Sequence, residues 1–340
     1  MKILFESYNE VTQNEAGGVA IKIRLLQQYL SKFADVKLFD KWNDSFLETD
    51  IIHLFMPTVQ NLNTFKLAKK LGKKVVVSAI ATPEKKRKMI AKRIINKFLN
   101  EKSPYYAKQY IFTNSDYIIT ETDLEKKFIV SCYGVQENRV MVIPNGVTIS
   151  EVEIDPQYFK NKTGIENGFV LQVGRFDRNK NQLSTIKAIN GTELKLVLIG
   201  GPDKDDMDYY EACKKAAGKN VTFLGWVNHD DPLLYSAYKS CHTFILPSFH
   251  EILGNAMIEA AALGANVVVT NALPVSEWGI EDLCLTIDPH NVTDIRNKLL
   301  ESLKKEKDSL LERRIKELFS WDSVVDQHLE VYKKVLRCEL

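Results

Sequence analysis

The chain has 340 residues, of which 45% are hydrophobic and 26% charged, so it is long enough for two globular domains of ordinary size. The formal net charge is only +2, but residues 1–150 hold 23 Lys and Arg against 15 Asp and Glu, and residues 151–340 are net negative. This asymmetry favours an anionic partner for the first half.

Five scattered cysteines occupy positions 132, 213, 241, 284 and 338, and no two of them have the spacing of metal ligands. Such a set fits a reduced cytoplasmic protein better than a disulfide framework. The first residues do not form a signal peptide, and no run reaches the roughly 18 apolar residues of a membrane span.

Strands and helices alternate in the first 81 residues. We expect strands at 2–6, 35–40, 50–56 and 73–81, and helices at 19–33 and 61–71. This alternation predicts a mainly parallel, doubly wound sheet. Gly17 and Gly18 would allow a ligand to approach the backbone closely, although glycine pairs also form plain turns. We interpret His53, on a strand, as a structural residue.

The stretch 84–102 combines charge with helical spacing of apolar residues. It holds eight Lys and Arg against only Glu84 and Glu101. A basic amphipathic helix of this kind can lie on anionic lipid or bind a lipid-linked phosphate. The alternative is a surface helix whose apolar face packs on the domain core, and the sequence leaves both open.

A turn signal separates the two halves. A helix at 123–133, ended by Gly134, and a strand at 139–143 precede Pro144, Asn145 and Gly146. Proline, asparagine and glycine in succession favour a turn, and 151–156 lacks a helical period. We place the link between the domains here.

The second half starts with a strand at 169–173 and a loop that carries Arg175 and Lys180. Two cations in such a loop could clamp a diphosphate and neutralise charge on a leaving group. They could also be ordinary charges of a solvated turn. Further on, 293–319 is expected to be a long helical region, and Ser320, Trp321 and Asp322 to begin a last helix.

The stretch 246–270 reads as strand, loop, helix and strand, with the helix at 253–263. A helix start gathers unpaired N–H groups that suit a phosphate, and these would come from the backbone of Ile252, Leu253, Gly254 and Asn255. Glu251 at the rim could accept hydrogen bonds from a sugar, and Glu259 from ribose hydroxyls. The alternative is a helix-terminal charge and a solvated glutamate.

The residues P-S-F-H-E-I-L-G-N-A-M-I-E-A-A-A-L-G-A, at 247–265, resemble the nucleotide-sugar motif of retaining glycosyltransferases of family 4, which have the GT-B fold. I-P-N-G-V at 143–147 is similar to the segment between their domains. Three departures stand out. Ile252 stands where the family often has a glycine, and Thr148 stands where it has an acid. Many family members carry a histidine near the acceptor after the corresponding strand, but residues 78–83 contain none. We therefore assign no histidine a role near the acceptor.

The resemblance implies two Rossmann-like domains with a cleft between them. They would be an acceptor-binding domain at 1–148 and a nucleotide-sugar-binding domain at 149–320, with a helix at 321–340 crossing back to the first. Arg175 and Lys180 would contact the donor diphosphate, which Gly17 and Gly18 would face. Glu259 would bind ribose and Glu251 the transferred sugar. Residues expected at the base are Gly225, Trp226 and Val227.

We therefore expect a retaining glycosyltransferase in which Glu251, Arg175 and Lys180 serve catalysis. It would use a UDP or GDP sugar, a saccharide or lipid-linked acceptor, no metal, no other cofactor and no nucleic acid. The acid-any-acid patterns at 203–205 and 206–208, typical of metal-dependent glycosyltransferases, are discounted because acidic loops are common. We expect cytoplasmic localisation, with a possible contact of 84–102 at the inner membrane face. Alternatives are an epimerase of the same fold and a non-catalytic sugar-binding module. A dinucleotide dehydrogenase would need a Gly-rich fingerprint that neither half has.

Overall fold

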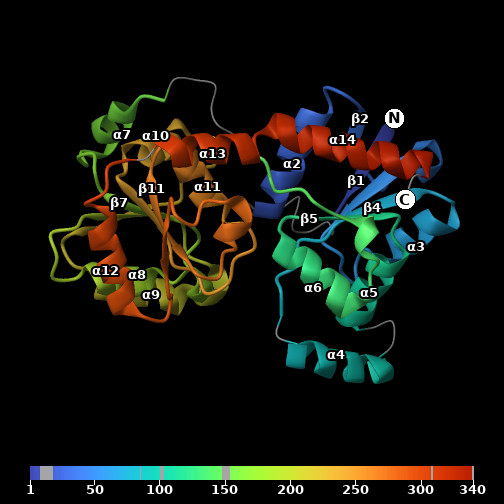
Figure 1. Ribbon diagram of the computed structural model, residues 1–340, viewed down its shortest axis with the longest axis horizontal. Helices are drawn as coiled ribbons and strands as arrows, with labels where there is room; N and C mark the ends of the chain where they lie inside the picture. The colour runs from blue at the N-terminus through green and yellow to red at the C-terminus, as the bar shows by residue number, and fades with distance from the viewer. Residues whose placement is uncertain (8–17, 85, 100–102, 148–153, 308, 339–340) are drawn as a thin grey trace. The chain divides into compact units, whose positions relative to one another are not determined.

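The computed structural model describes residues 1–7, 18–84, 86–99, 103–147, 154–307 and 309–338 (Figure 1). It divides into two units, Met1–Gly146 with Trp321–Leu340, and Val147–Ser320. Each unit contains a six-stranded parallel sheet with helices on both faces. This confirms the expected α/β fold with two Rossmann-like domains. Within the described residues, no helix has the length and apolarity needed to span a bilayer.

The sheet of the first unit has the strand order β2-β1-β3-β4-β5-β6. Its strands are β1 (Lys2–Glu6), β2 (Asp35–Leu38), β3 (Ile51–Phe55), β4 (Lys74–Ser78), β5 (Tyr117–Thr120) and β6 (Val140–Val142). The inner strands β3, β4 and β5 are almost wholly buried because helices cover both faces, which explains their continuous apolar runs.

The described residues of the first unit form six α-helices. They are α2 (Gly18–Leu30), α3 (Leu62–Lys70), α4 (Lys86–Leu99), α5 (Pro104–Asn114), α6 (Asp123–Tyr133) and α14 (Trp321–Arg337). Helices α2 and α14 pack on one face of the sheet, and α3, α5 and α6 on the other. The ends of α6 follow local chemistry, because the Thr122 side chain accepts a hydrogen bond from the Glu125 N–H and Gly134 takes a left-handed conformation.

Gly146, in the turn that links the halves, has a packing role that its sequence context did not reveal. A Cβ at this position would lie 2.3 Å from the Trp321 side chain, so only glycine fits. The Trp321 ring in turn stacks on Tyr29 of α2, with ring centroids 4.9 Å apart. These contacts fix the start of α14 on the first unit.

The sheet of the second unit has the strand order β12-β11-β10-β7-β8-β9. Its strands are β7 (Val170–Val173), β8 (Leu196–Ile199), β9 (Val221–Gly225), β10 (Thr243–Leu246), β11 (Asn266–Thr270) and β12 (Leu285–Ile287). The chain runs from β7 outward to β9 and then returns to place β10 on the other side of β7. The direction of winding therefore reverses between β7 and β10.

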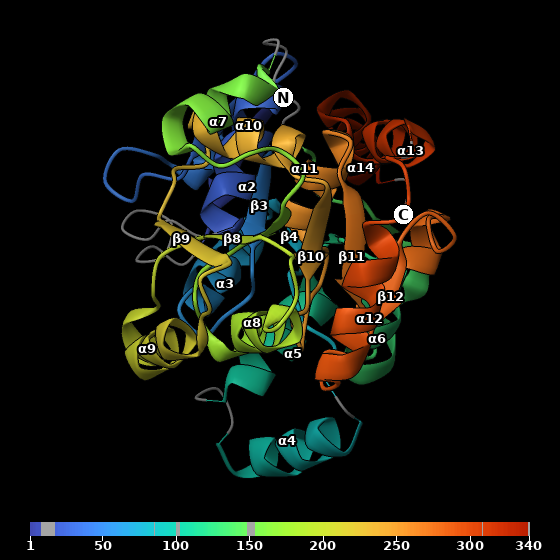
Figure 2. The same ribbon diagram turned by 90° about the vertical axis from the view of Figure 1, so that its left-hand side faces the viewer.

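In the described part of the second unit, helices cover both faces of the sheet, and Figure 2 shows the two layers. One layer contains α7 (Pro156–Thr163), α10 (Pro232–Ser240), α11 (Asn255–Ala262) and α13 (Ser309–Phe319). The other layer contains α8 (Gln182–Ile189), α9 (Met207–Ala216) and α12 (Val292–Ser302).

Two expected helix boundaries were wrong. The region 293–319 forms two helices, because α12 packs on α8 and α13 packs on α11, so the chain must change from one face of the sheet to the other between them. The helix expected from Leu253 begins at Asn255, because Gly254 before it adopts a left-handed conformation with φ 74°. A Cβ on Gly254 would also lie 2.9 Å from the Leu246 side chain.

Two buried histidines join α14 to the sheet of the first unit. His53 on β3 lies 2.7 Å from the Tyr332 hydroxyl through Nδ1 and 2.9 Å from the Ser78 hydroxyl through Nε2. His328 on α14 donates from Nδ1 to the Val324 carbonyl at 2.7 Å. Its Nε2 is buried and has no partner among the described residues. Burial lowers the pKa of His328 to about 3 and that of His53 well below its ordinary value. His53 is thus a structural residue, as its position on a strand suggested.

These histidines should make unfolding depend on pH. An unfolded histidine binds a proton below about pH 6.5 and the buried His328 does not, so the free energy of unfolding should fall as the pH drops, by about 1.4 kcal/mol per pH unit. His328→Leu should remove this contribution. In urea unfolding between pH 6.5 and pH 5, we expect the free energy of unfolding of the wild type to fall by about 2 kcal/mol more than that of the variant.

The comparison with the variant is needed because other groups act in the opposite direction. Burial raises the pKa of Glu6 and Glu125 to about 7, so their contribution to stability is lost as the pH rises from 4.5 toward 7. Both proteins share these carboxyl groups, and their effect cancels in the difference. A difference between the proteins that does not change with pH would contradict the assignment to His328.

Candidate functional site

The reversal of winding between β7 and β10 defines the candidate site of the second unit. In parallel sheets, ligands bind outside the carboxyl ends of the strands at such a point. Two loops leave the sheet there, one at 174–181 after β7 and the other at 247–254 after β10. The first carries Arg175 and Lys180, and the second carries Glu251. The fold thus brings together residues that are about 70 positions apart in the sequence.

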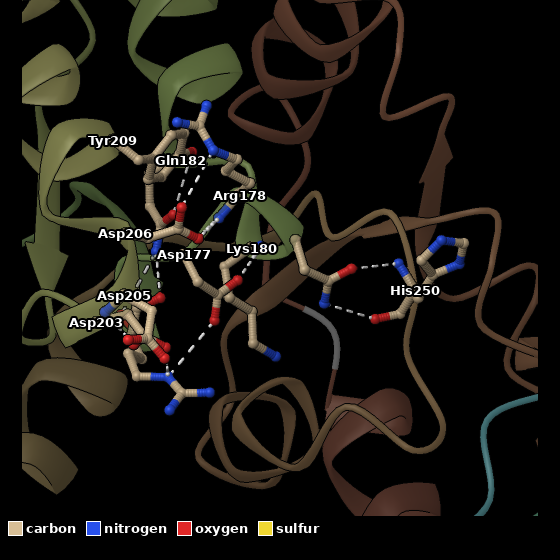
Figure 3. A network of polar contacts seen from close by, with 12 residues as sticks. Asp177, Arg178, Lys180, Gln182, Asp203, Asp205, Asp206, Tyr209 and His250 are labelled. Carbon is tan, nitrogen blue, oxygen red and sulfur yellow. Dashed lines mark hydrogen bonds and ion pairs between the residues drawn. The ribbon is translucent and has the colours of Figure 1, made fainter.

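Lys180 and Glu251 form an ion pair across these loops. The Lys180 Nζ donates to Glu251 Oε1 at 2.6 Å. The Glu251 side chain is only 10% exposed and that of Lys180 28%, so the pair is largely shielded from water. Lys180 is the last residue of the short 3₁₀ turn Arg178–Lys180, whose start is capped by the Asp177 side chain (Figure 3).

Arg175 faces the acidic side of the same loop. Its Nε lies 3.1 Å from an oxygen of Asp203 and 3.6 Å from one of Asp177, and its side chain is 57% exposed. Its carbonyl accepts a hydrogen bond from the Gln182 side chain at 2.9 Å, which holds the loop against the start of α8. Arg175 therefore presents a guanidinium group to solvent with two partly shielded carboxylates beside it.

Two asparagines that sequence reasoning missed fasten the loops together. The Asn179 amide accepts from the His250 N–H at 2.9 Å and donates to the His250 carbonyl at 3.0 Å, so it joins the residues that precede Lys180 and Glu251 in the two loops. Figure 3 shows these two bonds at His250. The Asn181 amide donates to the carbonyls of Pro247 and Pro289. Only their position beside Lys180 could have singled them out, since asparagine in a loop usually serves a local turn.

Glu259 lies on α11, where both of its carboxylate oxygens have partners. The His229 Nε2 lies 3.0 Å from Oε1, and the Tyr238 hydroxyl donates to Oε2 at 2.9 Å. The bond to Glu259 raises the pKa of His229, and burial, assisted by Glu259, raises the pKa of Tyr238 well above its ordinary value. Glu259 is therefore not the solvated glutamate of the alternative interpretation. Sequence reasoning did not find His229 or Tyr238.

The acidic residues after β8 pair with arginines. Asp203 contacts Arg175, and Asp206 and Asp208 contact Arg178 (Figure 3). Within the described residues, no group of three or more His, Cys, Asp or Glu side chains is arranged to hold a metal ion. Three of the four acidic residues in the patterns at 203–208 are therefore partners of guanidinium groups.

The remaining predicted residues lie in different surroundings. Gly225 ends β9, and Trp226, half exposed, follows it with its indole N–H donating to the Asn228 side chain at 2.9 Å. Ile252 and Leu253 both lie before α11, although Leu253 was expected to begin that helix. Gly18 is the first residue of α2, and Gly17 lies outside the described residues.

A cavity of about 330 Å³ lies next to this region but does not coincide with it. Its walls include Arg178, Asn181, Ser184, Tyr209 and Phe249. Arg175, Lys180, Glu251 and Glu259 do not line it. The convergence of two loops at the reversal of winding, and not the shape of this cavity, therefore identifies the candidate site.

The pairing of Arg175 with Asp203 should oppose the binding of an anion. A diphosphate that contacts Arg175 must displace or share the Asp203 carboxylate, so Asp203→Asn should tighten the binding of inorganic pyrophosphate by roughly three- to tenfold at low salt. Asparagine can still cap the short helix at 204–206 as Asp203 does. Isothermal titration calorimetry measures the change.

Asp208→Asn is the matched control, because Asp208 pairs with Arg178 and not with Arg175. Equal tightening in both variants would mean that only the overall charge of the loops matters. That result would contradict a specific role of the Arg175–Asp203 pair.

Comparison with known proteins agrees with the geometry. The family model described as Glycosyltransferase Family 4 matches residues 3–151, and the model described as Glycosyl transferases group 1 matches residues 154–318. An uncharacterized glycosyltransferase of Methanocaldococcus jannaschii is 26% identical in an alignment 264 positions long, which covers 69% of this chain and 65% of that protein. The O-antigen chain mannosyltransferase B of Escherichia coli is 24% identical in an alignment 233 positions long, which covers 64% of this chain and 60% of that enzyme. This chain thus covers less than two thirds of the length of both relatives.

Solved structures show the same fold. Sucrose-phosphate synthase from Thermosynechococcus elongatus superposes with a TM-score of 0.78 at 17% identity, and the match covers 99% of each chain. The Anabaena protein HepE in complex with UDP and glucose superposes with a TM-score of 0.72 at 16% identity over 98% of this chain and 100% of that one. With both halves matched by the family models, the chain belongs to the group 1 glycosyltransferases of family 4, which have the GT-B fold.

Proposed function

We propose that the protein transfers a sugar from a nucleotide diphosphate sugar to a saccharide or lipid-linked acceptor. The observation that carries this proposal is the Lys180–Glu251 pair beside Arg175, at the carboxyl ends of the strands where winding reverses. A cation for the diphosphate and a carboxylate for sugar hydroxyls are then within one hydrogen bond of each other.

The chemistry of the donor fits this arrangement. As the bond between the sugar and the diphosphate breaks, negative charge grows on the leaving diphosphate, and fixed cations stabilise that charge in the transition state. Arg175 and Lys180 supply two cations, and the start of α11 adds backbone N–H groups with a partial positive charge. These groups take the role that a metal ion has in other transferases, so the proposed reaction needs no metal.

In this proposal the two glutamates bind different parts of the donor. Glu251 is held by Lys180 at the rim of the loop and accepts hydroxyl hydrogen bonds from the transferred sugar. Glu259, deeper on α11, accepts bonds from the ribose. We propose retention of the anomeric configuration by attack on the face of the sugar that the diphosphate leaves, and we assign no carboxylate as nucleophile. The anomeric coupling constant of the product in a proton NMR spectrum tests this, and an inverted centre would rule it out.

Two similar proteins support a proposal for the class of donor and for the pathway. One relative is named as an O-antigen mannosyltransferase, and a structural neighbour was solved with UDP and glucose. We therefore propose a UDP or GDP hexose as the donor and a role in polysaccharide or glycoconjugate synthesis.

Nucleotide binding is the first test. A ligand that binds only the folded protein raises its melting temperature by mass action. We expect either UDP or GDP to raise the melting temperature more than ADP does. This shift should be the same with magnesium and with EDTA, because the cations of the loop replace the metal.

The Lys180→Ala variant provides the control for this panel. It should lose most of the shift, since it removes the cation that Glu251 orients. No shift with any nucleotide would contradict the transferase assignment and favour the sugar-binding alternative. A shift that EDTA abolishes would contradict metal independence.

Helix α4 is a candidate for contact with the acceptor's membrane. Met89 packs into the core of the first unit, whereas Ile90 and Ile94 are 50% and 55% exposed. The exposed Arg87, Lys88 and Lys92 surround them, and Glu84 pairs with Lys92 at 2.6 Å. Among the side chains of α4 that the structure describes, Met89 therefore serves packing, and Ile90 and Ile94 lie exposed beside a basic surface. Residues 85 and 100–102 of the predicted basic stretch lie outside the described residues.

We propose that this surface binds the anionic inner leaflet, where lipid-linked acceptors are presented. Each cation near an anionic membrane contributes about 1 kcal/mol, and each isoleucine adds buried apolar area. Reversing Arg87 and Lys88 to Glu should therefore weaken binding to phosphatidylglycerol-containing vesicles at least ~10-fold. Vesicle sedimentation, with pure phosphatidylcholine vesicles as the reference, measures this.

The apolar part of the contact has its own matched control. Ile90→Ser with Ile94→Ser should also weaken vesicle binding. Leu67→Ser should not, although Leu67 is exposed to the same 50% as Ile90 and lies on α3 of the same unit. Equal sedimentation of all these variants and the wild type would rule out the membrane contact.

A further inference from the structure

We propose that His229 and Tyr238 are positioning residues, which hold the two carboxylate oxygens of Glu259 in the orientation that reads the paired hydroxyls of a ribose. This inference rests on the proposed function, since it concerns the ribose of a nucleoside diphosphate donor. It assigns specificity for ribose to an array of three side chains and not to Glu259 alone.

Three separate elements contribute to the array. Glu259 lies on α11, Tyr238 on α10, and His229 in the loop at 226–231 between β9 and α10. The two hydrogen bonds of the array are 3.0 and 2.9 Å long, and each ends on a different oxygen of Glu259. A carboxylate held at both oxygens from two directions cannot rotate about its last bond. Its remaining acceptor positions are then fixed in space before a ligand arrives.

The number of acceptor positions matches a ribose. A carboxylate can accept about four hydrogen bonds, and His229 and Tyr238 use two of them. Two positions remain, one on each oxygen, which suit the neighbouring 2′ and 3′ hydroxyl donors of a ribose. Because the orientation is already fixed, binding loses less side-chain entropy than it would with a free glutamate.

The burial of the three side chains agrees with this role. Tyr238 is fully buried, so its hydroxyl can serve only inside the protein. The Glu259 side chain is 12% exposed and that of His229 27%, so neither is enclosed as Tyr238 is. A carboxylate kept partly open in this way can still receive donors from a ligand, which one enclosed in the core could not.

His229 also connects the ribose site to the residues expected at the base. It belongs to the same loop as Trp226 and Asn228, whose side chains bond to each other at 2.9 Å. The bond from His229 to Glu259 therefore fixes this loop relative to α11. A ligand held by Glu259 would find the loop already in place.

The test compares ligands that differ in one part. Isothermal titration calorimetry measures the affinity for the nucleoside diphosphate that wild-type protein binds, for its 2′-deoxy analogue and for inorganic pyrophosphate. Comparing these affinities separates ribose recognition from phosphate recognition. We expect the wild type to prefer the ribose form over the deoxy form by about tenfold, the scale of one hydrogen bond to a charged group. His229→Ala and Tyr238→Phe should each bind the nucleoside diphosphate about five- to twentyfold more weakly and lose most of this preference. Their affinity for pyrophosphate should not change.

Rescue and control variants exclude a general loss of structure. His229→Gln, whose amide can donate in place of Nε2, should recover most of the affinity. His242→Ala should bind all three ligands as the wild type does. His242 bonds to its neighbour Thr243 at the amino end of β10, whereas the ligand loops follow the carboxyl ends of the strands.

Two results would overturn the inference while leaving the proposed function intact. One is an equal loss of pyrophosphate and nucleoside diphosphate affinity in His229→Ala and Tyr238→Phe. The other is tighter nucleotide binding by His229→Ala, which would mean that the histidine occupies the position of the ribose. Wild-type protein that binds pyrophosphate but no nucleotide would instead overturn the proposed function, and the inference with it.

Discussion

The parallel pairing of β7 with β10 is the constraint on which the candidate site depends. Thr243 and Phe244 of β10 lie opposite Val170 and Leu171 of β7, although the intervening chain forms two strands and three helices. Because both strands point the same way, the loops that follow them emerge side by side. The Lys180–Glu251 pair is a consequence of this register, since a slip by one residue would turn every strand side chain to the opposite face.

A site built on loops needs support, because loops gain little from packing. Here amides provide it. Asn179 bonds to the backbone N–H and carbonyl of His250, and the Asn181 amide donates to the carbonyls of Pro247 and Pro289. Neutral amides suit this purpose because they bind backbone without adding charge beside the proposed diphosphate site. The same logic explains why Glu259 is held by a tyrosine and a histidine and not by lysine or arginine, whose fixed charge would compete for the carboxylate.

The sequence could predict the sheets and the residues at the loop ends, because both depend on local pattern. Continuous apolar strands next to amphipathic helices indicate a parallel sheet, and cations or carboxylates after a strand indicate its functional edge. It could not predict partners made by the fold. His229 and Tyr238 are 30 and 21 residues from Glu259, and no local pattern marks either of them. The prediction that the helix starts at Leu253 was wrong for a related reason, since the left-handed conformation of Gly254 and the lack of room for a Cβ beside Leu246 are features of the fold.

The distribution of charge shows why local placement matters more than net charge. Residues 151–340 are net negative, and yet the proposed diphosphate site lies within them. Arg175 stays more than half exposed although the carboxylates of Asp203 and Asp177 lie beside it, and Lys180 pairs with Glu251. The proposal therefore rests on where the two cations lie and not on a local excess of positive charge. The basic excess of the first half is concentrated instead at 84–102, where α4 carries no acidic residue along its length. The protein is proposed to bind two kinds of anion, a diphosphate and a lipid surface. Each therefore needs a different arrangement of cations. The diphosphate requires a few cations that neighbouring side chains orient, and the membrane requires many exposed cations that need no fixed partner.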